Sequence, residues 1–424
     1  MNNTPHSILE PEIILKNISI KNFRGFETFK IDLDSKLNVI IGENGSGKTA
    51  FLDCIAKILL IFIQNLRKKR IYAKKIFDVS DFRYGSPQKP SVQADFSLED
   101  ERTGFDISFR GDSLQVEPSN PKALQKLMNG MTQQQEPFNL PLFAYYPVAY
   151  APVEHIDFKG ITTKSAPQDI FTAYDGILNK KYFDFNSFFI WYKWQENIEK
   201  QLGENNILDA VRDAVYSVLS DDNNRFSELS VNWLNDPNGE MFVHKNGIPL
   251  NINQLSSGEK TLLVIVSDLA RCLVIANPHR KNPLDGYAII LIDEVDLHLH
   301  PGWQRAIIPK LQKTFPNSQF IVTTHSPLVL SKIKPRHVVI LSDFKILEKT
   351  PHTFGRDTNS ILYELMGVRQ RPEEIQKQID KVYELMDELN TEKAKEMLKA
   401  LSGDLGENDY EIVRAHTHIH FMED

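Results

Sequence analysis

Residues 42–49 have the residue types and spacing of a loop that binds the phosphates of a nucleotide. They are Gly42-Glu-Asn-Gly-Ser-Gly-Lys48-Thr49, which fits the pattern Gly-x4-Gly-Lys-Ser/Thr. The glycines let the backbone turn tightly, so that consecutive N–H groups point inward beside the positive end of a helix. The lysine can then reach the β- and γ-phosphates of ATP, and the threonine hydroxyl can ligate Mg²⁺. The expected ATP contacts are Asn44, Gly45, Ser46, Gly47, Lys48, Thr49 and Ala50, and Thr49 is also an expected Mg²⁺ ligand.

Two carboxylates follow an apolar run at residues 288–292. The run Ala288-Ile-Ile-Leu-Ile292 predicts a buried parallel strand, and Asp293-Glu294 come directly after it. Two carboxylates at the end of a buried strand are costly unless they face a cation or another polar site. We therefore expect Asp293 to hold Mg²⁺ through water, and Glu294 to be the catalytic base that polarises the attacking water.

Two more polar segments have positions that favour the same site. Gln319-Phe-Ile-Val-Thr-Thr-His325 predicts a strand with a polar end. A histidine at the carboxyl end of a neighbouring parallel strand can donate a hydrogen bond to the γ-phosphate, so His325 joins Lys48 and Glu294 as an expected catalytic residue. The turn at residues 253–260, Asn-Gln-Leu-Ser-Ser-Gly-Glu-Lys, leads into an apolar helix at 261–275.

These motifs require a sheet whose strands end at one edge. We expect strands at 13–20, 28–33, 37–41, 92–96, 105–109, 142–146, 288–292, 319–323 and 337–341, and a helix at 49–63 directly after the glycine loop. Strands and helices alternate after residue 241, which indicates parallel strands with crossover helices. The predicted fold class is therefore α/β.

The middle and the end of the chain are less regular. Residues 111–141 hold several prolines and predict loops. Residues 181–219 have helical spacing and many aromatic side chains, eight of them within 182–194. We interpret them as a helical insertion with its own small core; a base-stacking platform is the alternative. Residues 372–421 predict two or three amphipathic helices. The expected division is an ATPase lobe at 1–110, an insertion at 111–240, a second ATPase lobe at 241–350 and a helical region at 351–424.

Composition excludes several classes of protein. The chain has 424 residues, 41% of them hydrophobic and 25% charged, with a net charge of −7, which excludes wholesale disorder and fibrous repeats. Its mild acidity argues against a protein that coats polyanions. No apolar run approaches the roughly 18–20 residues that span a bilayer. Two cysteines exclude a disulfide framework. We expect a cytoplasmic protein with no membrane partner.

Together the motifs resemble the soluble ABC-type ATPases of the SMC and RecF group. The phosphate loop, the turn at 253–260, the Asp-Glu strand and His325 come in that family's order, and Ile20-Lys-Asn-Phe-Arg-Gly-Phe26 is typical of the group. The resemblance implies an ABC-type ATPase head. Residues 293–301 and the C-terminal region, including Gly355-Arg-Asp-Thr-Asn359, look most like the ATPase subunits of Septu-type antiphage defence systems, which are also found with some retrons.

The resemblance implies partners as well as chemistry. In this family the signature turn of one copy covers the nucleotide held by another, so Ser256, Ser257 and Gly258 would contact ATP bound to the Lys48 of a second chain. The resemblance therefore implies a homo-oligomer that is at least a head-to-head dimer. In it, ATP joins the heads and hydrolysis releases them. The sequence has no motif of a metal nuclease, and the Septu resemblance implies that an HNH nuclease is a separate subunit, docked on the C-terminal helices.

Three departures from the family pattern bear on the expected activity. Glu259 replaces the usual glutamine of the signature, and His300 stands where an aspartate usually follows the strand carboxylates. No glutamine follows the strand at 142–146, so the usual Q-loop has no counterpart there. Hydrolysis is therefore expected to be slow or regulated. A long hooked tether is excluded, since the chain has no Cys-x-x-Cys and no coiled-coil arm.

Several weaker patterns leave alternatives open. The basic cluster of Arg67 to Arg70 with Lys74 and Lys75 is either a solvated helix end or a contact with DNA or RNA phosphates. In the last helix, His416 and His420 could share a metal, and Arg414 with His420 has the spacing of HEPN ribonucleases; a packed helix is the plainer interpretation. The alternative functions are accordingly a RecF- or SMC-like DNA repair ATPase and a stand-alone ribonuclease.

Overall fold

The computed structural model describes residues 10–67, 76–98, 101–111, 113–132, 137–148, 169–178, 185–234, 236–347, 352–366 and 371–423. The chain divides into two compact units, residues 1–356 and 357–424. The second unit begins six residues after the boundary expected at 351. The finer division of the first unit into two lobes and an insertion stays a prediction.

The core of the first unit is a six-stranded sheet in the order β14-β13-β3-β12-β11-β7. Its strands are β3 (Leu37–Gly42), β7 (Leu142–Tyr146), β11 (Ala288–Ile292), β12 (Ser318–Thr323), β13 (Val338–Ser342) and β14 (Lys345–Ile346). All neighbours pair in parallel except β13 and β14, which form a hairpin. Both faces of the sheet are covered, which is why its strands are continuous apolar runs. The α/β prediction is confirmed.

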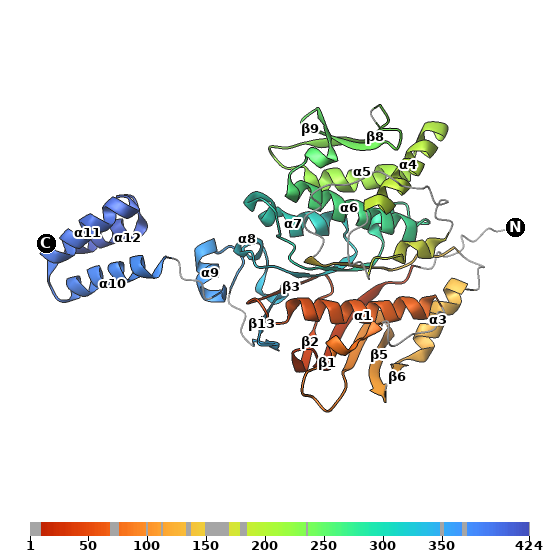
Figure 1. Ribbon diagram of the computed structural model, residues 1–424, viewed down its shortest axis with the longest axis horizontal. Helices are drawn as coiled ribbons and strands as arrows, with labels where there is room; N and C mark the ends of the chain where they lie inside the picture. The colour runs from red at the N-terminus through yellow and green to blue at the C-terminus, as the bar shows by residue number, and fades with distance from the viewer. Residues whose placement is uncertain are drawn as a thin grey trace. The chain divides into compact units, whose positions relative to one another are not determined.

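A second sheet lies on the other side of helix α1 (Lys48–Leu66). It has the order β2-β1-β4-β5-β6 and is antiparallel, with strands β1 (Ile13–Phe23), β2 (Phe26–Asp32), β4 (Ser91–Leu98), β5 (Glu101–Arg110) and β6 (Ser113–Pro118). Figure 1 shows α1 running between the two sheets. Phe62 of α1 contacts Phe96 and Phe105 of this sheet and Phe143 of the central sheet, at ring-centroid distances of 5.3–5.6 Å.

Helix α1 is long and apolar enough to cross a membrane by length and composition, and no other described helix is. It exceeds the helix expected at 49–63 by one residue at its start and three at its end. Packing between two sheets accounts for its composition, because a helix covered on both sides is apolar around most of its circumference.

The opposite face of the central sheet carries helices α4 (Phe185–Leu202), α5 (Asn206–Leu219), α6 (Ser257–Ala276) and α7 (Pro301–Thr314). The expectation that residues 181–219 form a separate core is wrong: α4 and α5 pack against α6, and α5 also packs against α7. Phe188, Phe189 and Tyr192 are fully buried there, so these aromatics are core residues and not a base-stacking platform. Tyr182 and Phe183 lie outside the described residues.

A third, antiparallel sheet follows α5. Its order is β10-β9-β8, with β8 (Phe226–Asn232), β9 (Glu240–Lys245) and β10 (Ile248–Asn251). The expected insertion at 111–240 was to be loops and helices, and β8 corrects this. The segment at 111–141, which was expected to be loops, contains β6 and helix α3 (Pro121–Thr132). The short helices are η1 (Val79–Asp81), η3 (Ile170–Tyr174), η4 (Ile252–Gln254), η5 (Pro283–Asp285), α8 (Pro327–Leu330) and η6 (Pro335–His337).

The second unit is helical, as predicted. It contains α9 (Thr358–Met366), α10 (Glu373–Asp387), α11 (Thr391–Leu405) and α12 (Tyr410–Glu423). The last three helices share an apolar core of Ile379, Val382, Met386, Ala394, Leu398, Leu401, Ile412, Ala415 and Ile419. Arg371 precedes α10 and donates two hydrogen bonds to Asp409, 2.8 and 2.9 Å long, which ties the start of α10 to the start of α12.

The two cysteines lie in the first unit and are not bonded to each other. Cys54 is in α1 and Cys272 is in α6, and both are free thiols with at most 1% exposure. Burial raises the pKa of the Cys54 thiol well above its ordinary value.

Candidate active site

The loop at residues 42–47 joins β3 to α1 at the carboxyl edge of the central sheet. Gly47 precedes α1 with φ 107°, and no side chain caps the N–H groups at the start of the helix. Gly42 has φ 152°, and a Cβ on it would lie 2.1 Å from the carbonyl oxygen of Leu341 in β13. A side chain at either glycine is therefore excluded, and the first turn of α1 is left open for an anion.

Phe344 supports this loop from behind. It lies at the tip of the β13–β14 hairpin, and its N–H donates to the carbonyl oxygen of Ser46 over 3.1 Å. Its ring packs edge-on against Phe26 at 5.2 Å, and a Cβ on Gly25 or Gly47 would come within 2.1 or 2.6 Å of it. The Phe344 ring therefore leaves no room for a side chain at Gly25, in the Asn-Phe-Arg-Gly turn, or at Gly47, the last glycine of the phosphate loop.

Two polar groups inside the loop fit a phosphate. Lys48 Nζ donates to the carbonyl oxygens of Gly42 and Glu43, both over 2.9 Å, so the ammonium already lies within the loop. Burial lowers the pKa of Lys48, and the charges of Asp293 and Glu294 oppose that change. Ser46 Oγ is buried without a hydrogen-bond partner. A buried hydroxyl without a partner is costly, and a phosphate oxygen in the loop would supply one.

Asp293 meets two threonine hydroxyls at the edge of the sheet. Thr49 Oγ1, at the start of α1, donates to Asp293 Oδ2 over 2.7 Å, and Thr323 Oγ1, at the end of β12, donates to Oδ1 over 2.5 Å. Asp293 is only 5% exposed. A hydroxyl and a carboxylate side by side are hard oxygen ligands of the kind that Mg²⁺ prefers, so the predicted pair of Thr49 and Asp293 fits the metal.

Glu294 follows in an uncommon backbone conformation. Its φ is 52°, and its N–H donates to the same Thr323 hydroxyl over 2.7 Å. Positive φ is unusual for a residue with a long side chain, and it occurs here where the strand ends and the chain turns away. Thr323 thereby fixes both carboxylate residues. Thr323 was not among the predicted site residues, although its place at the end of the predicted strand, two residues before His325, was a usable signal.

His325 lies two residues beyond Thr323, in the loop that follows β12, and β12 lies between β3 and β11 in the sheet. It is half-buried. The next residue, Ser326, accepts hydrogen bonds from the N–H groups of Leu328 and Val329 at the start of α8, which fixes the end of this loop. The sheet therefore brings Lys48, Asp293, Glu294 and His325 to one edge.

The turn at 255–259 begins α6. Ser256 is the N-cap: its Oγ accepts from the N–H of Glu259 over 3.3 Å, and its own N–H and O–H both donate to Glu259 Oε2 over 2.8 Å. Ser256 and Ser257 are exposed, whereas Gly258 is buried. A Cβ on Gly258 would lie 2.5 Å from the carbonyl oxygen of His298, so the glycine lets α6 touch the loop that follows Asp293 and Glu294.

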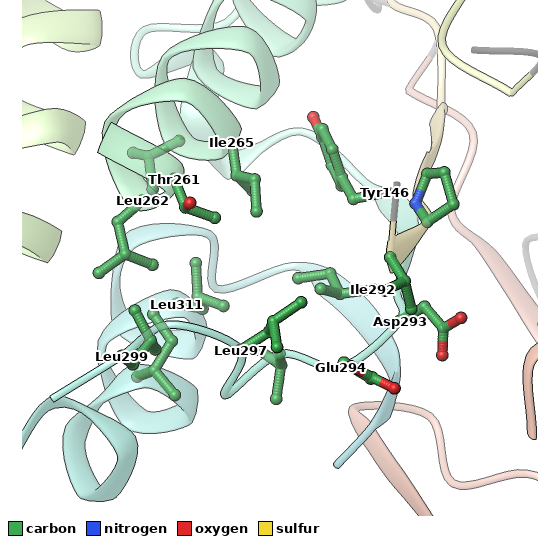
Figure 2. Close-up of a pocket in the computed structure, with 15 residues that line it drawn as sticks. Tyr146, Thr261, Leu262, Ile265, Ile292, Asp293, Glu294, Leu297, Leu299 and Leu311 are labelled. Carbon is green, nitrogen blue, oxygen red and sulfur yellow. The ribbon is translucent and has the colours of Figure 1, made fainter. Parts of the chain in front are cut away.

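An apolar cavity lies on the α6 side of the same loop. Figure 2 shows Ile265, Leu297, Leu299 and Leu311 around it, with the Asp293 carboxylate turned away from these side chains. Its lining comes from α6, α7, the end of β7 and the loop at 292–299. Helix α6 and the loop that carries Asp293 and Glu294 therefore share one apolar contact region. His300 ends the loop as the N-cap of α7, where its Nδ1 accepts from the N–H of Gly302 over 3.3 Å.

A hydrogen-bonded group occupies the end of β7, where no Q-loop glutamine was found. Tyr145 donates to Asp53 Oδ1 over 2.7 Å, and Arg24 Nη1 donates to Asp53 Oδ2 over 2.6 Å. Asp53 is four residues after Thr49 on α1 and so shares its face. Burial, followed by the Asp53 charge, raises the pKa of Tyr145. None of these three residues was predicted as part of the site.

The weaker candidates are the basic cluster that begins at Arg67 and the polar residues of α12. Residues 68–75 of the basic cluster lie outside the described residues, and Arg67 pairs with Asp175 at 2.9 Å. Within the described ranges, no group of three His, Cys, Asp or Glu side chains could hold a metal, so His416 and His420 lack a third ligand there. Arg414 lies over the ring of Tyr383 and pairs with Glu411 at 3.6 Å, the contacts of a packed helix.

Comparison with known proteins gives related ATPases. Residues 17–206 match a family model described as an AAA domain, and residues 174–331 match one described as an AAA domain, putative AbiEii toxin, Type IV TA system. The Retron Vc95 probable ATPase of Vibrio cholerae serotype O1 biovar El Tor is 31% identical over 420 residues, which cover 85% of this chain and 80% of that protein. The Septu protein PtuA of Bacillus mycoides is 25% identical over 406 residues, which cover 92% of this chain and 50% of that protein. Among solved structures, an SMC head domain from Thermotoga maritima aligns with 78% of this chain and 95% of that chain, with 14% identity and a TM-score of 0.43.

Proposed function

The chain belongs to the ATPase family of the Retron Vc95 probable ATPase and Septu PtuA, and from this premise we propose that it is the ATP-hydrolysing regulatory subunit of an antiphage defence complex. It associates with itself through ATP and controls an HNH nuclease carried on another chain. The observation that carries the ATPase part is the meeting of Lys48, Thr49, Asp293 and Glu294 at one edge of the central sheet.

The residues divide the work of hydrolysis. The N–H groups at residues 44–50 and the Lys48 ammonium bind the β- and γ-phosphates, while Thr49 and Asp293 hold the metal. Mg²⁺ supplies charge neutralisation on the phosphate oxygens when it is bound. Glu294 accepts a proton from the attacking water, and its fixed backbone at the end of β11 aims the carboxylate. His325 donates a hydrogen bond to the γ-phosphate.

A second copy completes the site. Ser256 and Ser257 are exposed at the N-terminal end of α6, the positive end of the helix dipole, which suits a triphosphate held by another chain. Contacts from both chains to the γ-phosphate join the heads, and loss of that phosphate removes them.

The second unit suits a basic partner. Residues 371–424 contain seven Lys and Arg against fourteen Asp and Glu, so this segment accounts for the whole net charge of −7. On α12, Tyr410, Val413 and Phe421 are 71%, 50% and 73% exposed and recur at helical spacing on one face. An apolar helix face inside an acidic unit fits a nuclease subunit, whose own nucleic-acid surface must be basic.

The test is to co-purify the chain with the product of a neighbouring HNH gene and to assay nucleic-acid cleavage across ATP concentrations. Lys48→Ala should lose ATP binding and the ATP dependence of cleavage, while Lys30→Ala, an exposed lysine on β2, should behave as wild type. A chain ending at residue 356 should hydrolyse ATP but not retain the nuclease. Wild-type protein that fails to bind ATP, or cleavage by the partner that is indifferent to this chain, would contradict the proposal.

A further inference from the structure

We propose that Lys245 is a positioning residue for ATP-dependent association: by pairing with Glu259 it neutralises a carboxylate beside the turn that receives a second copy's triphosphate. The inference rests on the proposed function, since it assumes that Ser256 and Ser257 meet a nucleotide held by another chain. It assigns a role to the three-stranded sheet of β8, β9 and β10, which has none in the chemistry described above.

The geometry ties this sheet to the signature turn. Lys245 is the last residue of β9, and its Nζ lies 2.7 Å from Glu259 Oε1. The other oxygen, Oε2, accepts the N–H and the O–H of Ser256, each over 2.8 Å. The two carboxylate oxygens therefore have different partners: Oε2 accepts hydrogen bonds from Ser256, and Oε1 accepts one from Lys245.

Burial makes the lysine necessary. The Glu259 side chain is only 8% exposed, and that of Lys245 is 28% exposed. Burial raises the pKa of Glu259, but hydrogen bonds from Lys245 and Ser256 outweigh it and lower the pKa, so the group is ionised. Without Lys245, one carboxylate oxygen would lose its donor, and an uncompensated negative charge would lie next to Ser256. A triphosphate carries several negative charges, so that carboxylate would repel it.

The sheet holds the lysine in place. Lys245 lies opposite Phe226 of β8, and its Nζ is 5.8 Å from the centre of that ring. The chain then runs through β10 and η4 directly into Leu255 and Ser256. Asn251 caps η4 by accepting from the N–H of Asn253 over 3.0 Å, which leaves little freedom between the sheet and the turn. Only a short, hydrogen-bonded segment of chain therefore separates Lys245 from the turn that contains Ser256 and Glu259.

The experiment measures ATP-dependent self-association of the full-length chain by sedimentation, and ATP affinity by calorimetry at concentrations where the chain is not associated. Lys245→Met should weaken ATP-dependent association by about tenfold or more and leave ATP affinity within about twofold. Lys245→Met combined with Glu259→Gln should restore association, because the neutral amide still accepts from Ser256 and adds no charge. Lys245→Arg should behave as wild type.

A matched control is Lys193→Met. Lys193 also lies over aromatic rings, 5.0 Å from the centre of Phe189 and 4.6 Å from that of Trp233, but it bonds to Asn238 and not to the signature turn. Association should be unchanged in this variant. Wild-type-like association of Lys245→Met would overturn the inference. So would an association that stays weak in the double variant while Lys245→Arg associates as wild type does. Wild-type chain that does not associate with ATP would overturn the proposed dimer as well, which separates the two failures.

Discussion

Thr323 links the two carboxylates that the site depends on. One hydroxyl donates to Asp293 and accepts the N–H of Glu294, so the carboxylate proposed to hold the metal and the backbone of the proposed base are fixed by the same atom. Because Thr49 holds the other oxygen of Asp293, that carboxylate is fixed on both sides. Outer groups of this kind orient ligands without touching the substrate.

Replacing Thr323 with Val keeps the shape of the side chain and removes the hydroxyl. We expect Thr323→Val to lower ATP hydrolysis by roughly 10–100-fold through misorientation of Asp293 and Glu294. ATP affinity measured without Mg²⁺ should be nearly unchanged, since the phosphate loop is intact. The control is Thr314→Val on α7, whose hydroxyl donates to Ser217 Oγ over 3.3 Å. Equal hydrolysis rates in the two variants would contradict this role.

Glu294→Gln separates binding from turnover. The amide cannot accept the proton of the attacking water, so we expect hydrolysis to fall by about 10²–10⁴-fold while ATP still binds. The ATP-joined form should accumulate, and sedimentation with ATP should show a larger species than the wild type does. Retained phosphate release in a steady-state assay would rule out Glu294 as the base.

The β13–β14 hairpin is the element that supports the phosphate loop from behind. Asp343 and Phe344 at its tip have φ values of 46° and 61°, an unusual conformation for residues with side chains. The turn is kept because it places one ring against Phe26 and the glycines at 25 and 47. The strain in the hairpin is thus offset by contacts that shape the loop.

Removing that ring should loosen the loop without touching the nucleotide. We expect Phe344→Ala to raise the Kd for ATP by about tenfold, which corresponds to about 1.4 kcal/mol, and to change the rate of hydrolysis at saturating ATP by less. Phe344→Leu should lose less affinity than Phe344→Ala. Phe354→Ala is the matched control, since Phe354 is 55% exposed. Calorimetric titration that gives wild-type affinity for Phe344→Ala would contradict the support role.

The elements that the sequence predicted are those with a strong local signal. The strands of the central sheet are apolar runs, and β7 and β11 begin and end at the predicted residues. Strand β8 of the third sheet escaped prediction because it has a bulge between Ser227 and Ser230, with Glu228 at φ 51°, which breaks the alternation of apolar and polar residues.

The residues of the site also fall into a predictable group and an unpredictable group. The glycine loop and the Asp-Glu pair were predictable because their spacing is local. The contacts of Thr323 with Asp293, of Phe344 with Ser46, and of Lys245 with Glu259 join residues 14 to 298 positions apart. Only the fold brings them together, so no spacing rule could have found them.

At the scale of the whole molecule, the chain places its catalytic groups in one unit and its excess negative charge in the other. The helical unit has a small apolar core, and the pair of Arg371 and Asp409 joins the starts of α10 and α12. A small core leaves stability sensitive to such a pair.

That pair predicts a pH dependence. The hydrogen bond from Arg371 lowers the pKa of Asp409 in the fold. Its contribution to stability is therefore fully present above the unfolded value, about 3.9, and is lost as the pH falls through the lower folded pKa. We expect amide exchange in α10 and α12 of the full-length chain, corrected for intrinsic rates, to lose protection as the pH falls below about 4. Arg371→Gln should lose that protection at pH 7, and identical profiles for the two proteins would contradict the role of the pair.

The burial of both cysteines has a practical consequence. Cys54 and Cys272 lie inside α1 and α6 with at most 1% exposure, and the raised pKa of Cys54 keeps little of it as the reactive thiolate. Maleimide dyes should therefore leave the folded native chain unlabelled. A single cysteine introduced at an exposed position would carry a fluorophore without prior removal of the native thiols, so energy transfer between two labelled copies can follow their approach and separation in real time.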